Sequence, residues 1–316
     1  MANAPAELTL PTDRPRPTVP TFRGARTSFH FSQTLTERLT QLSRQRGATL
    51  FMTLLAGFHA LLSRYSGQDD VVVGTPIAGR NRTETEGIIG FFANTLALRL
   101  DLSGDPTFEE LIRRAKKMTL NAYQHQEMPF ENLVEELNPE RSLSHNPLFQ
   151  ALFFLGNVPQ HAFELPGLEL RWAGVRNPEA TSKFDISVLM HQQPDHLAGR
   201  IEYNTDVFDE DRIGRMIGHY QVLLEAVVNN PELRLSELPL LTPEEKQRLL
   251  VEFNDNARYY PPMCVHELFA AQARRRPHAI AVVFRDQRLS YGELEARSSC
   301  LAAHLRRLGV GPRCRV

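Results

Sequence analysis

Residues 70–77, DVVVGTPI, decide the fold of this chain. Apolar residues follow one another through the run without the alternation that marks a strand with one face in water. Such a continuous apolar run is typical of a strand that is covered on both faces of a sheet. The run therefore predicts a central strand and, with it, a mixed α/β domain in which helices cover the sheet.

The residues before this strand predict two helices. Residues 49–66 are too apolar for a surface helix, so we expect a buried helix that Thr49 caps and that ends at Gly67. A more amphipathic helix precedes it. Thr34 and Glu37 have the spacing of a capping box, which predicts that this first helix starts at Thr34.

The residues after the central strand alternate between predicted strands and helices. Leucines at every second position of residues 96–102 indicate a strand. The next helix, 105–126, has a capping pattern at Thr107, and Pro129 begins a shorter helix. The remaining predicted elements are strands near 148–155, 168–172, 184–190 and 197–203 and a long helix over 209–228.

The pattern of the chain changes twice, which predicts its domain boundaries. Four prolines between residues 10 and 20 indicate an extended segment, and a mixed α/β lobe occupies 21–230. Residues 231–262 are predicted as a linker with one short helix, which Thr242 caps. Residues 263–316 begin a further α/β domain (helix, two strands, amphipathic helix), and we expect this domain to be incomplete. The predicted division is 1–20, 21–230, 231–262 and 263–316.

Composition excludes several classes of protein. A formal net charge of -1 gives no bulk electrostatic argument for nucleic acid or for an anionic membrane as a partner. The three cysteines have no CxxC spacing, which argues against a zinc site or a disulfide framework. The first residues lack the apolar region of a secretion signal, and no apolar run approaches the length of a membrane span. We expect a cytoplasmic protein with reduced thiols.

The sequence contains no recognisable catalytic motif. It has no phosphate-binding GxxxxGK[ST] loop, no GxSxG elbow and no HExxH metal motif. Its eleven histidines are scattered, and His59 lies on the apolar helix, where we expect a core histidine with its hydrogen bonds satisfied. We therefore predict no catalytic residue and no metal ligand in this chain.

Several stretches together resemble the second lobe of a nonribosomal peptide synthetase condensation domain. They follow one another in that family's order and with roughly its spacing. The stretches are LPTDRPRP (10–17), IIGFFANTLALR (88–99), HQEMPFENLVEEL (125–137), RSLSHNPLFQ (141–150), SKFDISV (182–188) and YNTDVFDEDRI (203–213). The first of them is similar to the segment that joins the family's two lobes.

The last residues are similar to the start of an adenylation (AMP-binding) domain. The stretch LSYGEL matches the first motif of that family through Leu289, Ser290, Tyr291, Glu293 and Leu294. A condensation domain followed by an adenylation domain is the usual order in an elongation module, so the two resemblances support each other.

The resemblance implies a fold and an activity. The family's two lobes resemble chloramphenicol acetyltransferase, and a tunnel between them admits the phosphopantetheine arms of two carrier proteins. The catalytic histidine belongs to an HHxxxDG motif in the first lobe, and this sequence contains no two adjacent histidines. We therefore expect this chain to bind no cofactor, whereas the parent synthetase uses phosphopantetheine, ATP and magnesium.

The resemblance also assigns residues to the tunnel. Asn94, Thr95 and Arg99 are expected to border it, and Gln126, Pro129 and Phe130 are expected near the path of the substrate arm. Arg141, Asn146 and Asp185 are candidates for holding the shape of the site. An equally good interpretation is that Asp185 and Arg141 form a structural ion pair.

Three interpretations of function remain open at this point. The chain is part of a peptide-forming enzyme and is inactive alone, or it is a module that binds carrier proteins without chemistry. The third interpretation is an acyltransferase that dimerises to rebuild the tunnel, and the missing histidine pair argues against it. We expect the face that meets the first lobe to expose apolar residues.

Overall fold

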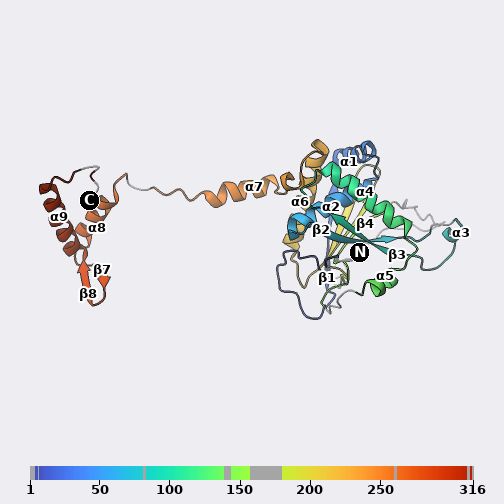
Figure 1. Ribbon diagram of the computed structural model, residues 1–316, viewed down its shortest axis with the longest axis horizontal. Helices are drawn as coiled ribbons and strands as arrows, with labels where there is room; N and C mark the ends of the chain where they lie inside the picture. Colours follow the sequence, from blue (N-terminus) through green and yellow to red (C-terminus); the bar gives the residue numbers. More distant parts are fainter. Residues whose placement is uncertain are drawn as a thin grey trace, which may run out of the picture. The chain divides into compact units, whose positions relative to one another are not determined.

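The computed structural model describes residues 4–5, 7–80, 83–138, 144–156, 180–259, 262–311 and 314. The chain divides into two compact units, Met1–Arg248 (unit 1) and Leu249–Val316 (unit 2). The strand predicted near 168–172 and the candidate residue Arg141 lie outside the described residues. Figure 1 shows the course of the chain through each unit.

Unit 1 is built on a six-stranded mixed sheet in the order β1-β6-β5-β4-β2-β3. Strand β4 runs parallel to both of its neighbours, β2 and β5, and the other pairs are antiparallel. The strands are β1 (Gly24–Phe31), β2 (Asp70–Ile77), β3 (Asn94–Asp101), β4 (Ala151–Gly156), β5 (Ile186–Gln192) and β6 (Leu197–Asn204).

The helices of unit 1 lie mainly on one face of the sheet (Figure 1). The prediction of a mixed α/β fold is therefore confirmed. The helices are α1 (Gln33–Gln45), α2 (Leu50–Ser66), α3 (Thr83–Glu86), α4 (Phe108–Gln124), α5 (Phe130–Leu137), α6 (Glu210–Asn229) and α7 (Pro243–Leu250), with a short 3-10 turn at Leu235–Glu237.

Strand β2 is covered on both faces, as its continuous apolar run predicts. Val71 and Val73 belong to the core beneath the helices. Val72 points to the other face and packs with Phe149 in a smaller cluster that α5 covers. At Gly74 the Phe149 ring lies so close that a Cβ atom would be 2.1 Å from its nearest carbon. The glycine in DVVVGTPI therefore makes room for this ring.

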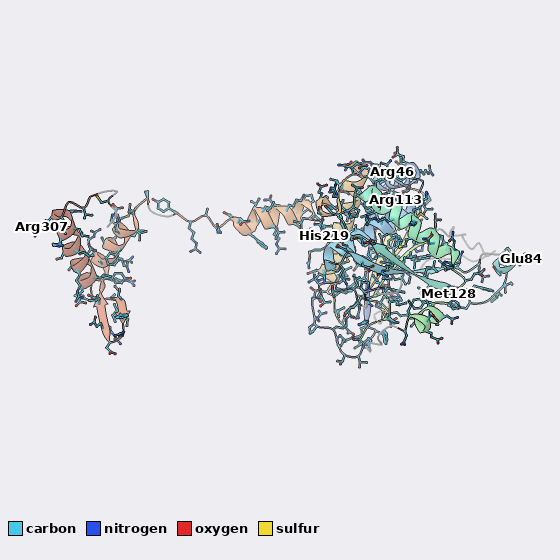
Figure 2. The ribbon with its side chains drawn as sticks, viewed as in Figure 1. Arg46, Glu84, Arg113, Met128, His219 and Arg307 are labelled. Carbon is cyan, nitrogen blue, oxygen red and sulfur yellow. The ribbon has the colours of Figure 1, made fainter. Side chains whose placement is uncertain are left out.

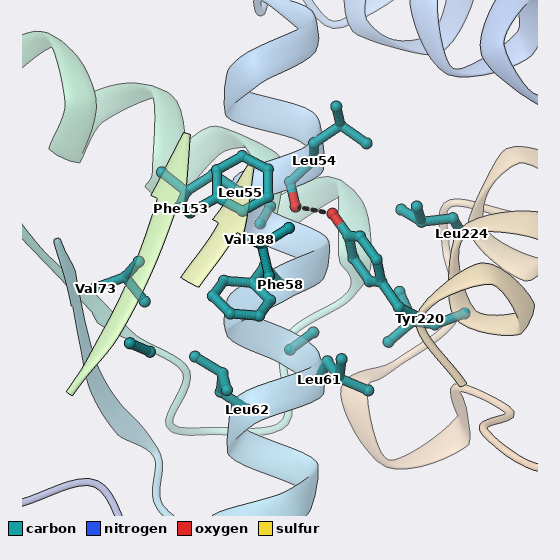
Figure 3. Packing of buried hydrophobic residues seen from close by; sticks show 14 of the residues in the cluster. Leu54, Leu55, Phe58, Leu61, Leu62, Val73, Phe153, Val188, Tyr220 and Leu224 are labelled. Carbon is teal, nitrogen blue, oxygen red and sulfur yellow. Dashed lines mark hydrogen bonds between the residues drawn. The ribbon is translucent and has the colours of Figure 1, made fainter. Parts of the chain in front are cut away.

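The main core is centred on α2, which is buried along most of its length (Figure 3). Phe58 packs against Phe153 and Tyr220, with ring centroids 5.5 and 6.2 Å away. Full burial of such a side chain contributes about 2–3 kcal/mol. The Tyr220 hydroxyl donates a hydrogen bond of 2.8 Å to the Leu54 carbonyl, so burial of this phenol leaves its O–H satisfied.

The caps of the helices agree with the sequence at most positions. The Thr49 and Thr107 hydroxyls accept backbone N–H groups in the first turns of α2 and α4, as predicted. The predicted start at Thr34 is wrong, because strand β1 continues to Phe31 and α1 follows directly. Ser32 is the N-cap of α1, and its hydroxyl accepts the N–H of Leu35 at 3.2 Å.

Residues 231–240, predicted as part of a linker, pack on unit 1. Leu235 and Leu238 are buried, and their burial holds this segment against the lobe. The Leu233 carbonyl accepts the N–H of Phe108 at 2.9 Å. The first part of the predicted linker is therefore packed on the body of unit 1.

Unit 2 is a small α/β assembly. Strands β7 (Ile280–Phe284) and β8 (Gln287–Ser290) form an antiparallel hairpin, with helices α8 (Val265–Arg275) and α9 (Tyr291–Arg307) beside it. A short 3-10 turn at Glu252–Asn254 precedes them. The helices meet through Phe269 and Tyr291, whose ring centroids are 5.8 Å apart. Leu301 and Leu308 of the predicted amphipathic helix are exposed.

Candidate functional site

A pocket of about 540 Å³ lies where β3 begins and where α4 connects to α5. It brings together five of the residues that the sequence assigns to a substrate path: Asn94, Thr95, Gln126, Pro129 and Phe130. The other residues of its wall are Gly79, Thr85, Phe91, Phe92, Ala93, Glu127 and Glu131.

Asn94 holds the wall of this pocket together. Its side-chain amide donates to the carbonyls of Gln126 and Met128, at 3.0 and 2.7 Å. Its carbonyl oxygen accepts the backbone N–H groups of Thr95 at 2.8 Å and Phe130 at 3.1 Å. Both amide hydrogens and the carbonyl oxygen are therefore used within the protein, and Asn94 shapes the pocket rather than offering a free polar group.

The connection between α4 and α5, which Asn94 holds, ends at the N-cap of α5. This N-cap residue provides no side-chain acceptor for the backbone N–H groups of the first turn. Pro129 is the N-cap residue of α5, and its ring cannot supply the oxygen that serine or aspartate gives at this position. The Asn94 oxygen takes that place from strand β3. Met128, labelled in Figure 2, is exposed at this connection.

The rim of the pocket carries exposed apolar side chains. Ile89 and Phe91 are almost fully exposed, and Ile88 is half exposed. The guanidinium of Arg80 lies 4.4 Å from the centre of the Phe92 ring, which places a cation on an aromatic face beside the pocket. The segment that enters the pocket wall at Phe91 therefore carries exposed apolar surface of the kind found where a protein meets a partner.

Arg99 lies on the same strand but not in the pocket wall. It is five positions from Asn94, and residues separated by an odd number point to opposite faces of a strand. Its guanidinium pairs with the Asp70 carboxylate on β2, with Nη2–Oδ2 at 2.6 Å. The hydrogen bond to Asp70 raises the pKa of Arg99 above its ordinary value. Arg99 therefore joins two strands.

Asp185 lies apart from the pocket and holds the N-terminal segment. Its carboxylate accepts two hydrogen bonds from Arg16, one of them at 2.8 Å, and both side chains are largely buried. Arg16 also donates to the Ser144 carbonyl at 3.5 Å. Asp185 therefore forms a structural ion pair with Arg16. The pair between Asp185 and Arg141 stays a prediction, because Arg141 lies outside the described residues.

Asn146 belongs to the same support. Its amide donates to the Lys183 carbonyl, and its own carbonyl accepts the Gln150 amide at 2.8 Å. The Gln150 side-chain oxygen in turn accepts the N–H of Leu8 at 2.7 Å. The sequence does not indicate Gln150 and Arg16 as supporting residues, although Gln150 is the last residue of RSLSHNPLFQ (141–150).

The pocket has the chemistry of a binding surface. Among the residues that the structure describes, its wall contains carboxylates, amides and aromatic rings and no histidine, cysteine or lysine. Within the described ranges, no three histidine, cysteine or acidic side chains gather as a metal site. The same part of the chain contains no helix that is long and apolar enough to cross a membrane.

The stretch LSYGEL builds the turn into the last helix of unit 2. Ser290 caps α9, because its hydroxyl accepts the N–H of Glu293 at 3.2 Å and its own N–H donates to the Glu293 carboxylate. The backbone hydrogen bond from Ser290 lowers the pKa of Glu293. Leu289 lies in β8, which ends at Ser290, and Tyr291 and Leu294 lie in the first turns of α9.

Two known families match this chain. The family described as "Condensation domain" matches residues 2–250, and the family described as "AMP-binding enzyme" matches residues 269–316.

Curated relatives include very long synthetases. The chain is 41% identical over 306 residues to gramicidin S synthase 2 of Brevibacillus brevis, which covers 96% of this chain and 7% of the relative. It is 42% identical over 313 residues to malpinin synthetase of Mortierella alpina, covering 99% of this chain and 4% of the relative. The chain thus spans less than a tenth of the length of either protein.

Solved structures show the same architecture. A four-domain nonribosomal peptide synthetase bound to AMP and glycine matches with a TM-score of 0.83 and 25% identity, over 97% of this chain and 24% of the other. The X-domain from teicoplanin biosynthesis matches with a TM-score of 0.70 and 30% identity, over 76% of this chain and 55% of the other.

Proposed function

This chain belongs to the condensation domain family over residues 2–250, and we propose that it supplies the second lobe of a condensation domain in a nonribosomal peptide synthetase elongation module. In this proposal residues 1–20 join the two lobes, 21–230 form the second lobe, 231–262 are the linker and 263–316 begin an adenylation domain. The family match to residues 269–316 supports this order.

The proposed reaction is peptide-bond formation between two carrier-bound substrates. The amine of the acceptor attacks the thioester carbonyl of the donor, a C–N bond forms, and the C–S bond breaks with release of the donor carrier's thiol. The amine also gives up a proton. We assign that proton transfer to the HHxxxDG histidine of the first lobe, because the resemblance gives that residue the catalytic role and the described wall of the pocket beside Asn94 contains no histidine.

The role left for this chain is to hold a substrate arm in place. Holding two reactants in a fixed geometry removes much of the entropic barrier to their reaction. The observation that carries the proposal is the Asn94 side chain, whose four hydrogen bonds fix the wall formed by Gln126, Pro129 and Phe130. In this proposal Thr95 borders the arm as well, and Arg99, Arg141, Asn146 and Asp185 maintain the lobe around it.

The proposed partners follow from this role. They are the peptidyl and aminoacyl carrier domains, the first condensation lobe and the remainder of a cytoplasmic synthetase. A phosphopantetheine arm supplies the thiol to which each substrate is attached, and the pocket's mixture of aromatic rings and amides suits its alternating alkyl and amide groups. ATP and magnesium serve the adenylation reaction of the parent.

The test is reconstitution. A first lobe bearing HHxxxDG is joined to residue 1, and donor and acceptor carrier proteins are loaded with aminoacyl groups. We expect the amide product, measured by mass spectrometry, from the joined protein and no product above background from this chain alone. Product from the chain alone, or none from a well-folded joined protein with several substrate pairs, would contradict the proposal.

A second candidate function is carrier binding without chemistry, which is favoured by a formed pocket with no histidine, cysteine or lysine among the described residues of its wall. Titration of the chain with carrier protein separates the two. Binding that requires the phosphopantetheine arm, together with a failed reconstitution, would favour the binding module.

A further inference from the structure

The part of unit 1 that follows α6, residues 230–248, is held to the rest of the unit further along than its composition suggests. Two consecutive residues at the end of α2, Arg64 and Tyr65, lie against it. The Arg64 guanidinium donates to the carbonyls of Leu235, Ser236 and Leu238, at 2.8, 3.2 and 3.0 Å. These bonds hold the first part of this segment.

Tyr65 is connected to α7 through the side chain of His219. Its hydroxyl lies 2.6 Å from Nδ1 of His219 on α6, and Nε2 of His219 lies 2.8 Å from Oε2 of Glu245 on α7. Burial of the phenol, with the nearby Glu245 carboxylate, raises the pKa of Tyr65 to about 12. Tyr65 therefore stays protonated and its O–H donates a hydrogen bond to Nδ1, so the single N–H of the ring lies on Nε2 and donates to Glu245.

Glu245 is also the residue that starts α7. The same Oε2 atom accepts the N–H of Thr242 at 2.9 Å, and the Thr242 hydroxyl accepts the N–H of Glu245 at 3.2 Å. One carboxylate oxygen thus joins the capping box of α7 to His219. Forming the first turn of α7 and attaching it to unit 1 therefore depend on the same atom.

Helix α7 buries little of its own surface. None of its eight residues is fully buried, and Leu250 at its end is 70% exposed. A helix of this length is not stable alone in water, because the first turn costs more than so few hydrogen bonds return. The polar contacts at Glu245 therefore contribute to keeping α7 folded.

We propose that Tyr65, His219 and Glu245 form a latch that holds the first turn of α7 on α2 and α6. With the latch closed, α7 is folded and unit 1 continues through this helix. With the latch open, α7 unfolds and the ordered part of unit 1 ends near residue 241. The latch therefore sets the residue at which the chain leaves the body of unit 1.

The structure also offers a steric way to open the latch. On α6, a Cβ atom at Gly218 would lie 3.1 Å from the Thr242 side chain, so alanine there would push the start of α7 outward. A Cβ atom at Gly214, one turn earlier on the same helix, would meet nothing within 4 Å. Gly214→Ala is therefore a matched control for Gly218→Ala.

The test is hydrogen exchange, followed by mass spectrometry, on the full chain at neutral pH, and it needs no enzymatic activity. We expect Glu245→Gln, Tyr65→Phe and Gly218→Ala each to speed exchange in α7 by roughly tenfold, the effect of losing one charge-assisted hydrogen bond or an equivalent contact. Glu244→Gln, which changes an exposed neighbour, and Gly214→Ala should leave α7 unchanged. Residues 233–239, which Arg64 holds separately, should keep their protection in all five variants.

Two outcomes would overturn the latch. One is α7 exchange in Glu245→Gln and Tyr65→Phe that equals the exchange in Glu244→Gln. The other is faster exchange that spreads equally to α2 and to residues 233–239, because these residues would then support unit 1 as a whole. A failed reconstitution of peptide-bond formation leaves this result unaffected, since exchange reports only on the chain itself.

Discussion

The Oδ1 atom of Asn94 accepts the backbone N–H of Phe130 at 3.1 Å, and this bond ties the first residue of β3 to the first residue of α5. The same side chain donates two hydrogen bonds to carbonyls of the connection before α5. Asn94 thus acts as both acceptor and donor. An aspartate in its place could act only as an acceptor.

We predict that Asn94→Asp is at least as destabilising as Asn94→Ala. The alanine variant loses four hydrogen bonds, whereas the aspartate variant keeps the bond to Phe130 but sets a carboxylate against the carbonyls of Gln126 and Met128. We expect a loss of about 2–4 kcal/mol in the free energy of unfolding for Asn94→Asp, measured with urea, and faster hydrogen exchange in α5. A milder effect of aspartate than of alanine would show that the two donated bonds contribute little.

The N-terminal segment provides a second prediction, from two arginines of unequal burial. Arg16 pairs with the buried Asp185, whereas Arg14 pairs with Asp209 where both side chains are about half exposed. Removing one partner of a buried pair leaves an uncompensated charge, but an exposed pair contributes little. We expect Arg16→Gln to lower the free energy of unfolding by about 3 kcal/mol and Arg14→Gln by less than about 1 kcal/mol.

The control for this prediction is the double variant Arg16→Met with Asp185→Leu. Because it removes both charges, it should recover part of the stability that Arg16→Gln loses. Equal losses for Arg14→Gln and Arg16→Gln in urea unfolding would mean that burial does not distinguish the two pairs.

Gly74 provides a third prediction, which concerns packing. An added Cβ would lie 2.1 Å from the Phe149 ring, and that ring is held in turn by Phe130 and Phe184, with centroids 5.4 Å away on each side. Overpacking of this kind costs about 1–3 kcal/mol. We expect Gly74→Ala to be destabilising and the double variant with Phe149→Leu to lose less than the sum of the single variants. Additive losses, measured by thermal or urea unfolding, would show that Phe149 is not the obstacle.

The sequence predicts those parts of the fold that depend on neighbouring residues. Caps at Thr49, Thr107 and Thr242 follow from spacing along one helix, and each is formed. The cap predicted at Thr34 is wrong. Thr34 and Glu37 have the spacing of a capping box, but Thr34 lies two residues after Ser32, which is the observed cap. Only the end of the preceding strand distinguishes the two, and the local pattern does not contain it.

The candidate site likewise contains residues that the sequence predicts and contacts that it does not. Motif resemblance selected Asn94, Gln126 and Phe130, and these residues meet at one pocket. The contact between Arg16 and Asp185 joins positions 169 residues apart, so no periodicity or spacing could indicate it. The attachment of α7 through His219 is missed for the same reason, since Glu245 reads as an ordinary capping-box glutamate in the sequence.

His59 provides the last prediction, and it concerns pH. The ring is fully buried on α2, as expected for a core histidine, with Nδ1 3.0 Å from the Leu55 carbonyl and Nε2 3.3 Å from the Leu98 carbonyl. A neutral ring has one N–H and can donate to only one of these carbonyls. Burial disfavours the charged ring and outweighs the two carbonyls, so it lowers the pKa of His59 from 6.5 to about 4. The unfolded chain therefore binds a proton at this residue more readily than the folded chain does.

The sign of the effect follows from that difference. Between pH 6.5 and pH 4 the unfolded state takes up the proton first, so stability falls as the pH falls, by about 2 kcal/mol between pH 7 and pH 5 from this residue. We expect His59→Leu to reduce the dependence of the unfolding free energy on pH by that amount, as measured by urea unfolding at the two pH values. Leu62→Ala, a buried and non-titrating change on the same helix, should lower stability by similar amounts at both. If His59→Leu and wild type lose stability equally between pH 7 and pH 5, the ring is already protonated in the folded protein, and the two carbonyls rather than burial determine its charge.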